Sequence, residues 1–131
     1  MGEAQAFIKS ERGGEELASE RALLLRALGD VEGIFGALMG KMGESIYHVG
    51  LQANRVLHAL AEVIIGWLLL GHAALALEKI DEASEKDRAF YEGKIASARF
   101  FCANVLPAIT LTRKLIEKSS LNVMQVNEAA F

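Results

Sequence analysis

The sequence predicts an all-α protein, an antiparallel bundle of three long helices with a short N-terminal helix before them. Three observations support this class: apolar residues recur with a helical rhythm in three long segments, the 131 residues contain one proline, and the separators between the segments are short. Runs that alternate apolar and polar residues, which are typical of half-buried strands, are scarce. A chain of this length holds one core, so we expect a single helical domain over residues 1–131.

The bundle is expected to begin with a short amphipathic helix over Ala4–Glu11, followed by the separator Gly13-Gly14. In the first long segment the apolar residues are spaced by threes, fours and sevens and form one stripe: Leu17, Leu24, Leu28, Val31, Phe35, Leu38 and Met42. Each interior glycine costs about 1 kcal/mol relative to alanine. The stripe keeps its phase across three such glycines, so one continuous helix is predicted.

The second long segment follows the turn Gly43-Glu44-Ser45 and has the most regular pattern. Its apolar positions alternate in steps of three and four: Ile46, Val49, Ala53, Val56, Leu60, Val63, Trp67, Leu70, Ala74 and Leu77. The run Val63–Leu77 is shorter than the about 20 residues that cross a hydrocarbon core, so a buried helix is favoured over a membrane span. Residues 63–70 are apolar on all sides, which predicts cover from a parent domain or a second copy.

The third long segment begins after Ile80–Ala83, where Ser84 and Asp87 have the spacing of a capping box. Its stripe runs through Tyr91, Ile95, Ala98, Cys102, Val105, Ile109, Thr112 and Ile116. Pro107 removes one backbone hydrogen bond and clashes with the preceding turn, so a kink is expected near residues 103–107.

Charge and cysteine content exclude some classes of function. The net charge is -3, with no dense basic run, so nucleic acid is not an expected partner. The single cysteine, Cys102, has no partner for an intramolecular disulfide, which favours a reducing compartment and a cytoplasmic location. The N-terminus lacks the basic start and apolar stretch of a secretory signal.

No motif in the sequence predicts a catalytic, cofactor-binding or metal-ligating residue. The glycine-rich segment 36–42 is one residue too short for a phosphate loop and lacks its Ser or Thr. None of His48, His58 and His72 has a glutamate three residues before it, as a bundle metal site requires. His58 and Glu62 are four residues apart, which favours a hydrogen bond or ion pair. Cys102 lies on an apolar stripe and is expected in the core.

One segment resembles a known family. It contains Phe-Tyr-Glu-Gly-Lys at 90–94, Ala-Arg-Phe-Phe at 98–101 and Leu-Pro at 106–107. With Gly66-Trp67 in the preceding apolar helix and a Glu-Ala-Ala-Phe end, this pattern is similar to the C-terminal domain of a subgroup of acyl-CoA dehydrogenases. The resemblance runs from about Val49 to Phe131 and is weak before Gly43.

The resemblance implies a parent flavoenzyme that desaturates an acyl-CoA thioester between its α and β carbons. In that family a glutamate removes the α proton and FAD accepts the hydride, and both belong to an upstream part. We therefore expect a C-terminal piece of a larger protein, with no cofactor of its own and no catalytic activity alone. Its expected partners are the catalytic core of the parent and further copies in a homo-oligomer, with acyl-CoA met only through the parent.

The resemblance also marks candidate interface residues, which are expected to pack between helices or onto the parent: Phe90, Tyr91, Gly93, Lys94, Arg99, Phe100, Phe101 and Trp67. Gly93 is expected to permit a close helix contact, and Lys94 and Arg99 to reach an interface. Two alternatives stay open. The chain is either a free-standing helical homodimerisation module, through its apolar faces, or a bundle that binds a small molecule between its helices.

Overall fold

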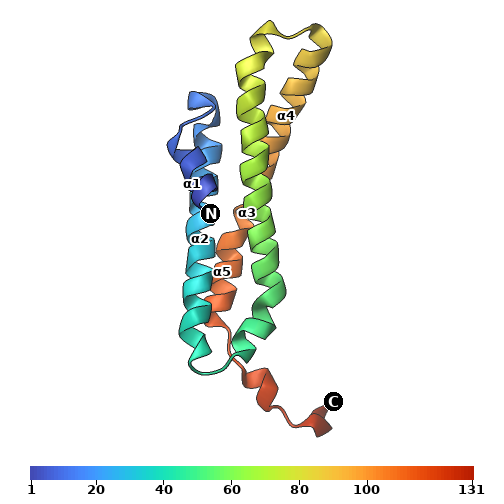
Figure 1. Cartoon of the computed structure of the whole chain (residues 1–131). Helices are drawn as coiled ribbons and strands as arrows, with labels where there is room; N and C mark the ends of the chain where they lie inside the picture. The colour runs from blue at the N-terminus through green and yellow to red at the C-terminus, as the bar shows by residue number, and fades with distance from the viewer.

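The computed structural model describes all 131 residues and contains no strands, which confirms the all-α class. It has five α-helices, shown in Figure 1: α1 (Gly2–Lys9), α2 (Ala18–Met42), α3 (Tyr47–Lys79), α4 (Glu85–Asn104) and α5 (Ala108–Lys118). Single turns of 3-10 helix cover Gly14–Leu17, Ile80–Glu82, Asn122–Gln125 and Glu128–Ala130. The segment after α5 extends away from the end of the bundle.

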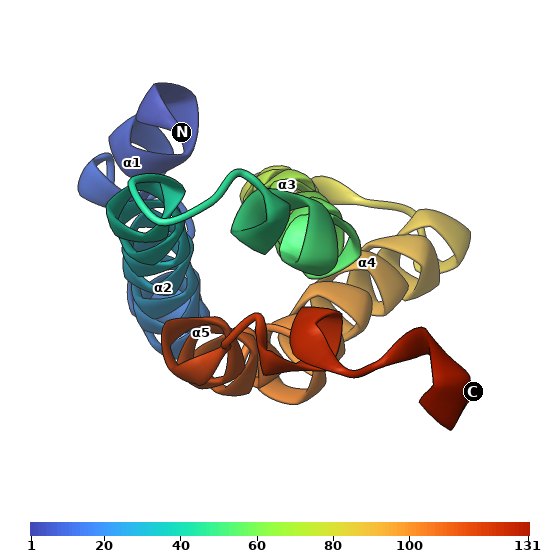
Figure 2. The same ribbon diagram turned by 90° about the horizontal axis from the view of Figure 1, so that it is seen from below.

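The helices form an elongated bundle in which α2 and α3 run antiparallel. α4 packs against the upper part of α3 as it is drawn in Figure 1, and α5 continues downward against α2. Seen from below in Figure 2, α2, α3 and the α4–α5 pair stand at the corners of a triangle, with α1 outside α2. The predicted bundle of three long rods is therefore confirmed, with the third rod divided in two.

The division lies at Pro107, where the sequence predicted a kink. The position was correct, but the change is a break: α4 ends at Asn104 and α5 begins at Ala108. The turn between them buries Leu106, which is 1% exposed. Gly66 of α3 makes room for this side chain, because a Cβ at Gly66 would lie 3.2 Å from both Leu106 Cδ atoms.

The core contains 21 buried apolar residues contributed by all five helices and the turns between them. Most of the expected stripe positions lie in it, including Leu24, Leu28 and Val63. Four expected core residues, Phe35, Met42, Ile46 and Ala53, are instead exposed. They lie at or next to the lower ends of α2 and α3, where no other helix covers the groove between the two.

The most apolar run of α3 is buried on one side only. Leu70 and Ala74 are buried, whereas Ile64 and Leu68 are exposed, so the expectation of a buried helix over 63–77 was correct for one face and wrong for the other. By length and composition alone, residues 47–82 and 85–125 each reach what a membrane crossing requires, a test that the core helix of a soluble protein passes as well.

A polar cluster fastens α5 to α2. The buried Asp30 carboxylate accepts hydrogen bonds from Thr110 Oγ1 at 2.5 Å and from Arg113 Nη1 at 3.4 Å. Gly33 leaves room for the guanidinium, since a Cβ there would lie 2.5 Å from Arg113 Cζ. Hydrogen bonding and charge from Glu117, and then from Asp30, raise the pKa of Arg113. α5 is thus fixed by directional contacts as well as by its apolar stripe.

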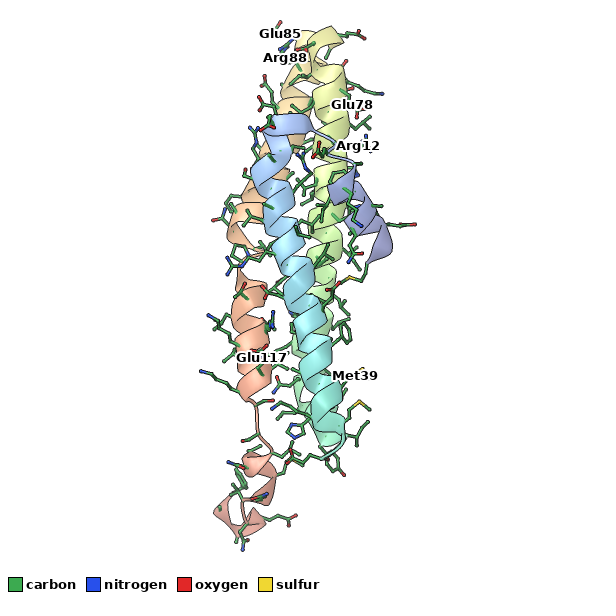
Figure 3. All side chains as sticks on the ribbon, turned by 90° about the vertical axis from the view of Figure 1, so that its left-hand side faces the viewer. Arg12, Met39, Glu78, Glu85, Arg88 and Glu117 are labelled. Atoms are coloured by element: carbon green, nitrogen blue, oxygen red, sulfur yellow. The ribbon has the colours of Figure 1, made fainter.

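The loop before α2 is held by arginine contacts. Arg21 donates hydrogen bonds from Nη1 to the backbone oxygens of Arg12 at 2.7 Å and Gly14 at 2.8 Å. Gly13 has a φ of 81°, in the left-handed region that glycine adopts without strain. Arg12 also forms a 3.0 Å ion pair with Glu78 of α3, and Figure 3 labels both residues. The loop is therefore tied to α2 and to α3.

The predicted cap of the third segment is present. Ser84 Oγ accepts a 3.2 Å hydrogen bond from the Asp87 backbone N–H and donates a 2.8 Å hydrogen bond to the Asp87 carboxylate. This contact satisfies one of the free N–H groups at the start of α4.

Candidate interaction surface

Three of the candidate residues form one cluster at the start of α4. The rings of Phe90 and Tyr91 meet edge to face with centroids 5.9 Å apart, and Lys94 Nζ lies 5.1 Å from the centroid of the Phe90 ring. Together with His72 and Leu75 of α3 they line a shallow hollow of about 170 Å³. A partner that docks here would meet an aromatic ring, a cation and an imidazole in one small area.

Trp67 lies on the other side of the same part of α3. It lines a hollow of about 480 Å³ between α3 and α1, together with Phe7. His72 and Leu75 line this hollow as well as the one beside Phe90. Trp67 and the Phe90 cluster therefore border the two sides of one exposed strip of α3.

Arg99 forms hydrogen bonds and ion pairs with other residues of the chain. Its Nη2 donates to the backbone oxygen of Glu16 and to the Glu16 carboxylate, each at 2.9 Å, and its Nε lies 4.0 Å from the Glu20 carboxylate. These contacts join α4 to the start of α2. The Arg99 charge is therefore paired within the bundle, and a further contact of Arg99 with an interface stays a prediction.

The remaining candidates lie on separate faces of α4. Phe101 is partly buried against the core, while Phe100 is 67% exposed and points elsewhere. Nothing lies within 4 Å of a Cβ built on Gly93, so no other helix of this chain approaches it closely, and a close helix contact there stays a prediction. A step of one residue rotates a side chain by about 100° around a helix, which places Phe100 and Phe101 on different faces of α4.

The largest apolar feature was not singled out from the sequence. α2 and α3 form a groove of about 400 Å³ lined only by apolar side chains: Phe35, Leu38, Met39, Met42, Val49, Ala53, Val56, Leu57 and Leu60. Figure 3 shows Met39 projecting from α2 on the side where α1 lies. All of these residues except Met39 and Leu57 belong to the stripes that predicted the core, so the periodicity marked them as apolar but did not show that no helix covers them.

Reactive side chains are few and protected. Burial, with a smaller effect from the Glu20 carboxylate, raises the pKa of the Cys102 thiol to about 12, so the thiol is protonated at neutral pH. The interpretation of Cys102 as a core residue is confirmed. His58 and Glu62 line a polar groove between α3 and α5, and no three His, Cys, Asp or Glu side chains converge as a metal site would need.

His48 is a buried polar residue that the sequence did not predict. It is 1% exposed, its Nε2 lies 2.9 Å from the Glu44 carboxylate, and its Nδ1 has no hydrogen-bond partner. It stands at the turn between α2 and α3, where Lys41 also donates a 2.5 Å hydrogen bond to the backbone oxygen of Ser119. These contacts fix the lower end of the bundle.

The fold and its surface define an all-α domain whose exposed features are apolar faces and a small aromatic and cationic cluster. Residues 1–127 match the family described as acetyl-CoA dehydrogenase C-terminal like. The chain therefore belongs to this family. The match also covers the N-terminal third, so the resemblance extends further than the expected range from Val49 onward.

Similar proteins place this region inside larger acyl-CoA dehydrogenases. The chain is 44% identical to the broad-specificity linear acyl-CoA dehydrogenase FadE5 of Mycobacterium tuberculosis, over 99% of this chain and 22% of that protein. Two butyryl-CoA dehydrogenases of Syntrophomonas wolfei are 41% and 37% identical over 63% and 61% of this chain, and 14% and 13% of their own lengths. The chain thus spans less than a quarter of each of these relatives.

Proposed function

We propose that this chain serves as a non-catalytic C-terminal domain of an FAD-dependent acyl-CoA dehydrogenase, where it packs on the flavin-bearing part and supports the substrate site or the subunit assembly. The observation that carries the proposal is the coverage of FadE5: nearly all of this chain aligns with less than a quarter of that enzyme. In this account the remaining part of the parent provides the flavin and the glutamate base.

The surface of the chain supports a role in packing. Phe90, Lys94 and His72 gather on an open hollow, and large apolar side chains of α2 and α3 are exposed over a long face. Contiguous exposed apolar surface of this kind typically marks a protein interface. Exposed aromatic side chains are also enriched at the centres of interfaces.

The two largest hollows of the chain offer no unpaired arginine or lysine for the phosphates of FAD or CoA. The largest hollow, about 850 Å³, is lined by Glu16, Asp81 and Glu92, and its arginine, Arg99, already pairs with Glu16. Three carboxylates repel a pyrophosphate. The second hollow between α1 and α3 has Arg12 at its edge, but Glu78 pairs with it. Both groups therefore belong to the parent in this proposal, as does any contact with acyl-CoA.

The proposal is tested with a chimera of FadE5 in which residues 1–131 of this chain replace the aligned C-terminal region. Flavin content, mass and kcat/KM for linear acyl-CoA substrates would be compared with FadE5 itself and with FadE5 lacking the region. We expect the chimera to retain activity and the truncated enzyme to lose assembly or substrate affinity. A truncated enzyme with the same mass, Tm and kcat/KM as FadE5 would remove the basis of the proposal.

A free-standing helical homodimerisation module is the second candidate, favoured by the apolar groove between α2 and α3. A cytoplasmic location fits both candidates, because the one cysteine is a buried free thiol.

A further inference from the structure

The outward face of α3 carries a regular stripe of apolar residues that no other helix of the chain covers. We call it the outer stripe, and its members are Ala53, Leu57, Ala61, Ile64, Leu68, Gly71 and Leu75. Its four large members, Leu57, Ile64, Leu68 and Leu75, are between 44% and 63% exposed. At 1.5 Å per residue, the stripe is about 33 Å long.

The surroundings of the outer stripe leave it open along its length. α2 flanks one side of its lower part and α1 flanks the same side of its upper part, as the groove and hollow beside Leu57 and Gly71 show. The Phe90 cluster of α4 borders its other side near Leu75. None of the seven members is charged. An uncharged face of this length on a helix with a separate buried face requires a second partner.

The spacing of the outer stripe identifies that partner as a helix. From Leu57 to Leu75 its members are separated by 4, 3, 4, 3 and 4 residues. This alternation keeps a seam of side chains in line over several turns, and such seams pack against another α-helix by inserting side chains between those of the partner. A β-strand or an extended segment has no matching repeat.

The order of large and small residues makes the stripe complementary to itself. In an antiparallel pair with a two-fold axis beside Ile64, a residue before position 64 faces one about equally far after it. Leu57 then faces Gly71, and Leu68 faces Ala61. Leu75 faces Ala53, and Ile64 meets Ile64 of the second copy. Each Leu therefore lies opposite Gly or Ala, which is the arrangement that lets two helices interdigitate closely.

We propose that the outer stripe is a two-fold interface with α3 of a second copy, antiparallel and centred on Ile64. The same patch on both copies forms the contact, so the assembly closes as a dimer. This inference deepens the second candidate function and rests on it, because it names the surface through which two copies meet. It is tested on the 131-residue chain without any flavin-bearing part, so its failure is distinguishable from a failure of the packing on a parent enzyme.

Gly71 offers a variant that separates dimerisation from folding. A Cβ at Gly71 meets nothing within 4 Å in the chain, and Gly71 lines an open hollow of about 480 Å³. We therefore expect the monomer to accommodate Gly71→Leu, which also removes the low helix propensity of glycine. In the dimer the new side chain meets Leu57 of the second copy. Gly29→Leu is the matched control, since Gly29 also lies in a helix with open space around its Cβ, but on α2 and away from the outer stripe.

Sedimentation equilibrium measures the outcome. At roughly 100 µM, where a Kd below about 10 µM gives mostly dimer, we expect the wild type and Gly29→Leu at twice 14.2 kDa. Gly71→Leu is expected near the monomer mass, with a Kd raised at least tenfold, and Leu57→Ala in the same chain is expected to restore the dimer. A monomeric wild type, or a Gly71→Leu protein that dimerises as the wild type does, would overturn the proposal.

Cysteine cross-linking tests the position of the axis independently. Ile64→Cys places two thiols beside the axis and is expected to give a disulfide-linked dimer on mild oxidation. Leu57→Cys alone is expected not to, because it faces Gly71. The buried Cys102 supplies no competing thiol. Cross-linking through Leu57→Cys but not Ile64→Cys would refute the antiparallel register. If neither variant cross-links and the mass is that of a monomer, the two-fold proposal is refuted, and a helix of the parent becomes the expected partner of the outer stripe.

Discussion

The contact between Gly66 and Leu106 leads to a prediction about coupled stability. Leu106 lies in the turn between α4 and α5 and is 1% exposed, so Leu106→Ala leaves a cavity and is expected to lower the free energy of unfolding by about 3 kcal/mol. Gly66→Ala has two opposing effects. Helix propensity favours alanine by about 1 kcal/mol, whereas the new Cβ would lie 3.2 Å from both Leu106 Cδ atoms. This contact is tighter than most Cβ contacts, and the buried Leu106 side chain has little room to move away, so we expect Gly66→Ala to be destabilising by about 1 kcal/mol overall.

The double variant makes the prediction specific. In the Leu106→Ala background the Cδ atoms are gone, so Gly66→Ala is expected to stabilise the protein by about 1 kcal/mol. The two effects of Gly66→Ala differ in sign, which gives a coupling free energy of about 2 kcal/mol. Gly29→Ala, whose Cβ meets nothing, is expected to stabilise both backgrounds equally.

Urea unfolding followed by circular dichroism at one protein concentration measures all the variants. The slope m is expected to stay constant while the midpoint changes. If Gly66→Ala changes the free energy of unfolding by the same amount in both backgrounds, then Leu106 does not occupy the space above Gly66. The account of how the α4–α5 break is packed would then be wrong.

Three further outcomes are expected from local contacts. The pKa of Cys102 is raised to about 12, against 9.0 for a free thiol, so the native state keeps the thiol proton at pH values where the unfolded state has lost it. The free energy of unfolding therefore falls as pH rises from 9 toward 12, by at most about 1.4 kcal/mol per pH unit. Chemical unfolding of the wild type and of Cys102→Ala across this range isolates the effect as the difference between their pH dependences. Ser84→Ala removes the cap of α4 and should cost about 1 kcal/mol in the same assay, whereas Ser97→Ala, in the middle of α4, should cost less. Arg21→Ala frees the backbone oxygens of Arg12 and Gly14, and trypsin should cleave after Arg12 several times faster than in the wild type; equal cleavage rates would show that Arg21 does not hold the loop.

Much of the fold followed from the sequence because helical periodicity is a local property. The stripe of the first long segment kept its phase through its glycines, and α2 is continuous from Ala18 to Met42. Pro107 marked the break of the third segment because proline lacks the backbone N–H. The extent of the change was not predictable, since it depends on Leu106 finding space beside Gly66 of another helix.

Burial on the two faces of α3 could not be decided from the sequence. Both faces carry apolar residues at steps of three and four, and periodicity does not say which face meets the rest of the chain. Phe35 and Met42 were expected in the core because they continue the apolar stripe of α2. They are exposed because no helix covers the lower groove between α2 and α3. The apolar pattern predicts that these faces need cover, but it could not show which of them lack it within the chain.

The candidate interface was predictable only in part. The resemblance selected a stretch of α4, and the structure brings Phe90, Tyr91 and Lys94 together beside α3. Arg99 and Phe100 are in the same stretch of sequence but lie outside this cluster. The turn of the helix directs their side chains away from it, and Arg99 forms an ion pair with Glu16. The contacts that divide them come from distant parts of the chain, which a local motif does not contain.

The most direct test of the central claim is whether this chain binds a flavin-bearing acyl-CoA dehydrogenase core. FadE5 lacking the region that aligns with this chain, in a preparation that retains its flavin, would be mixed with residues 1–131 and followed by sedimentation velocity at the flavin absorbance. The account predicts that the flavin boundary moves faster in the presence of the chain and that the chain alone carries no flavin. Independent sedimentation of the two proteins, or flavin bound by the chain alone, would contradict it.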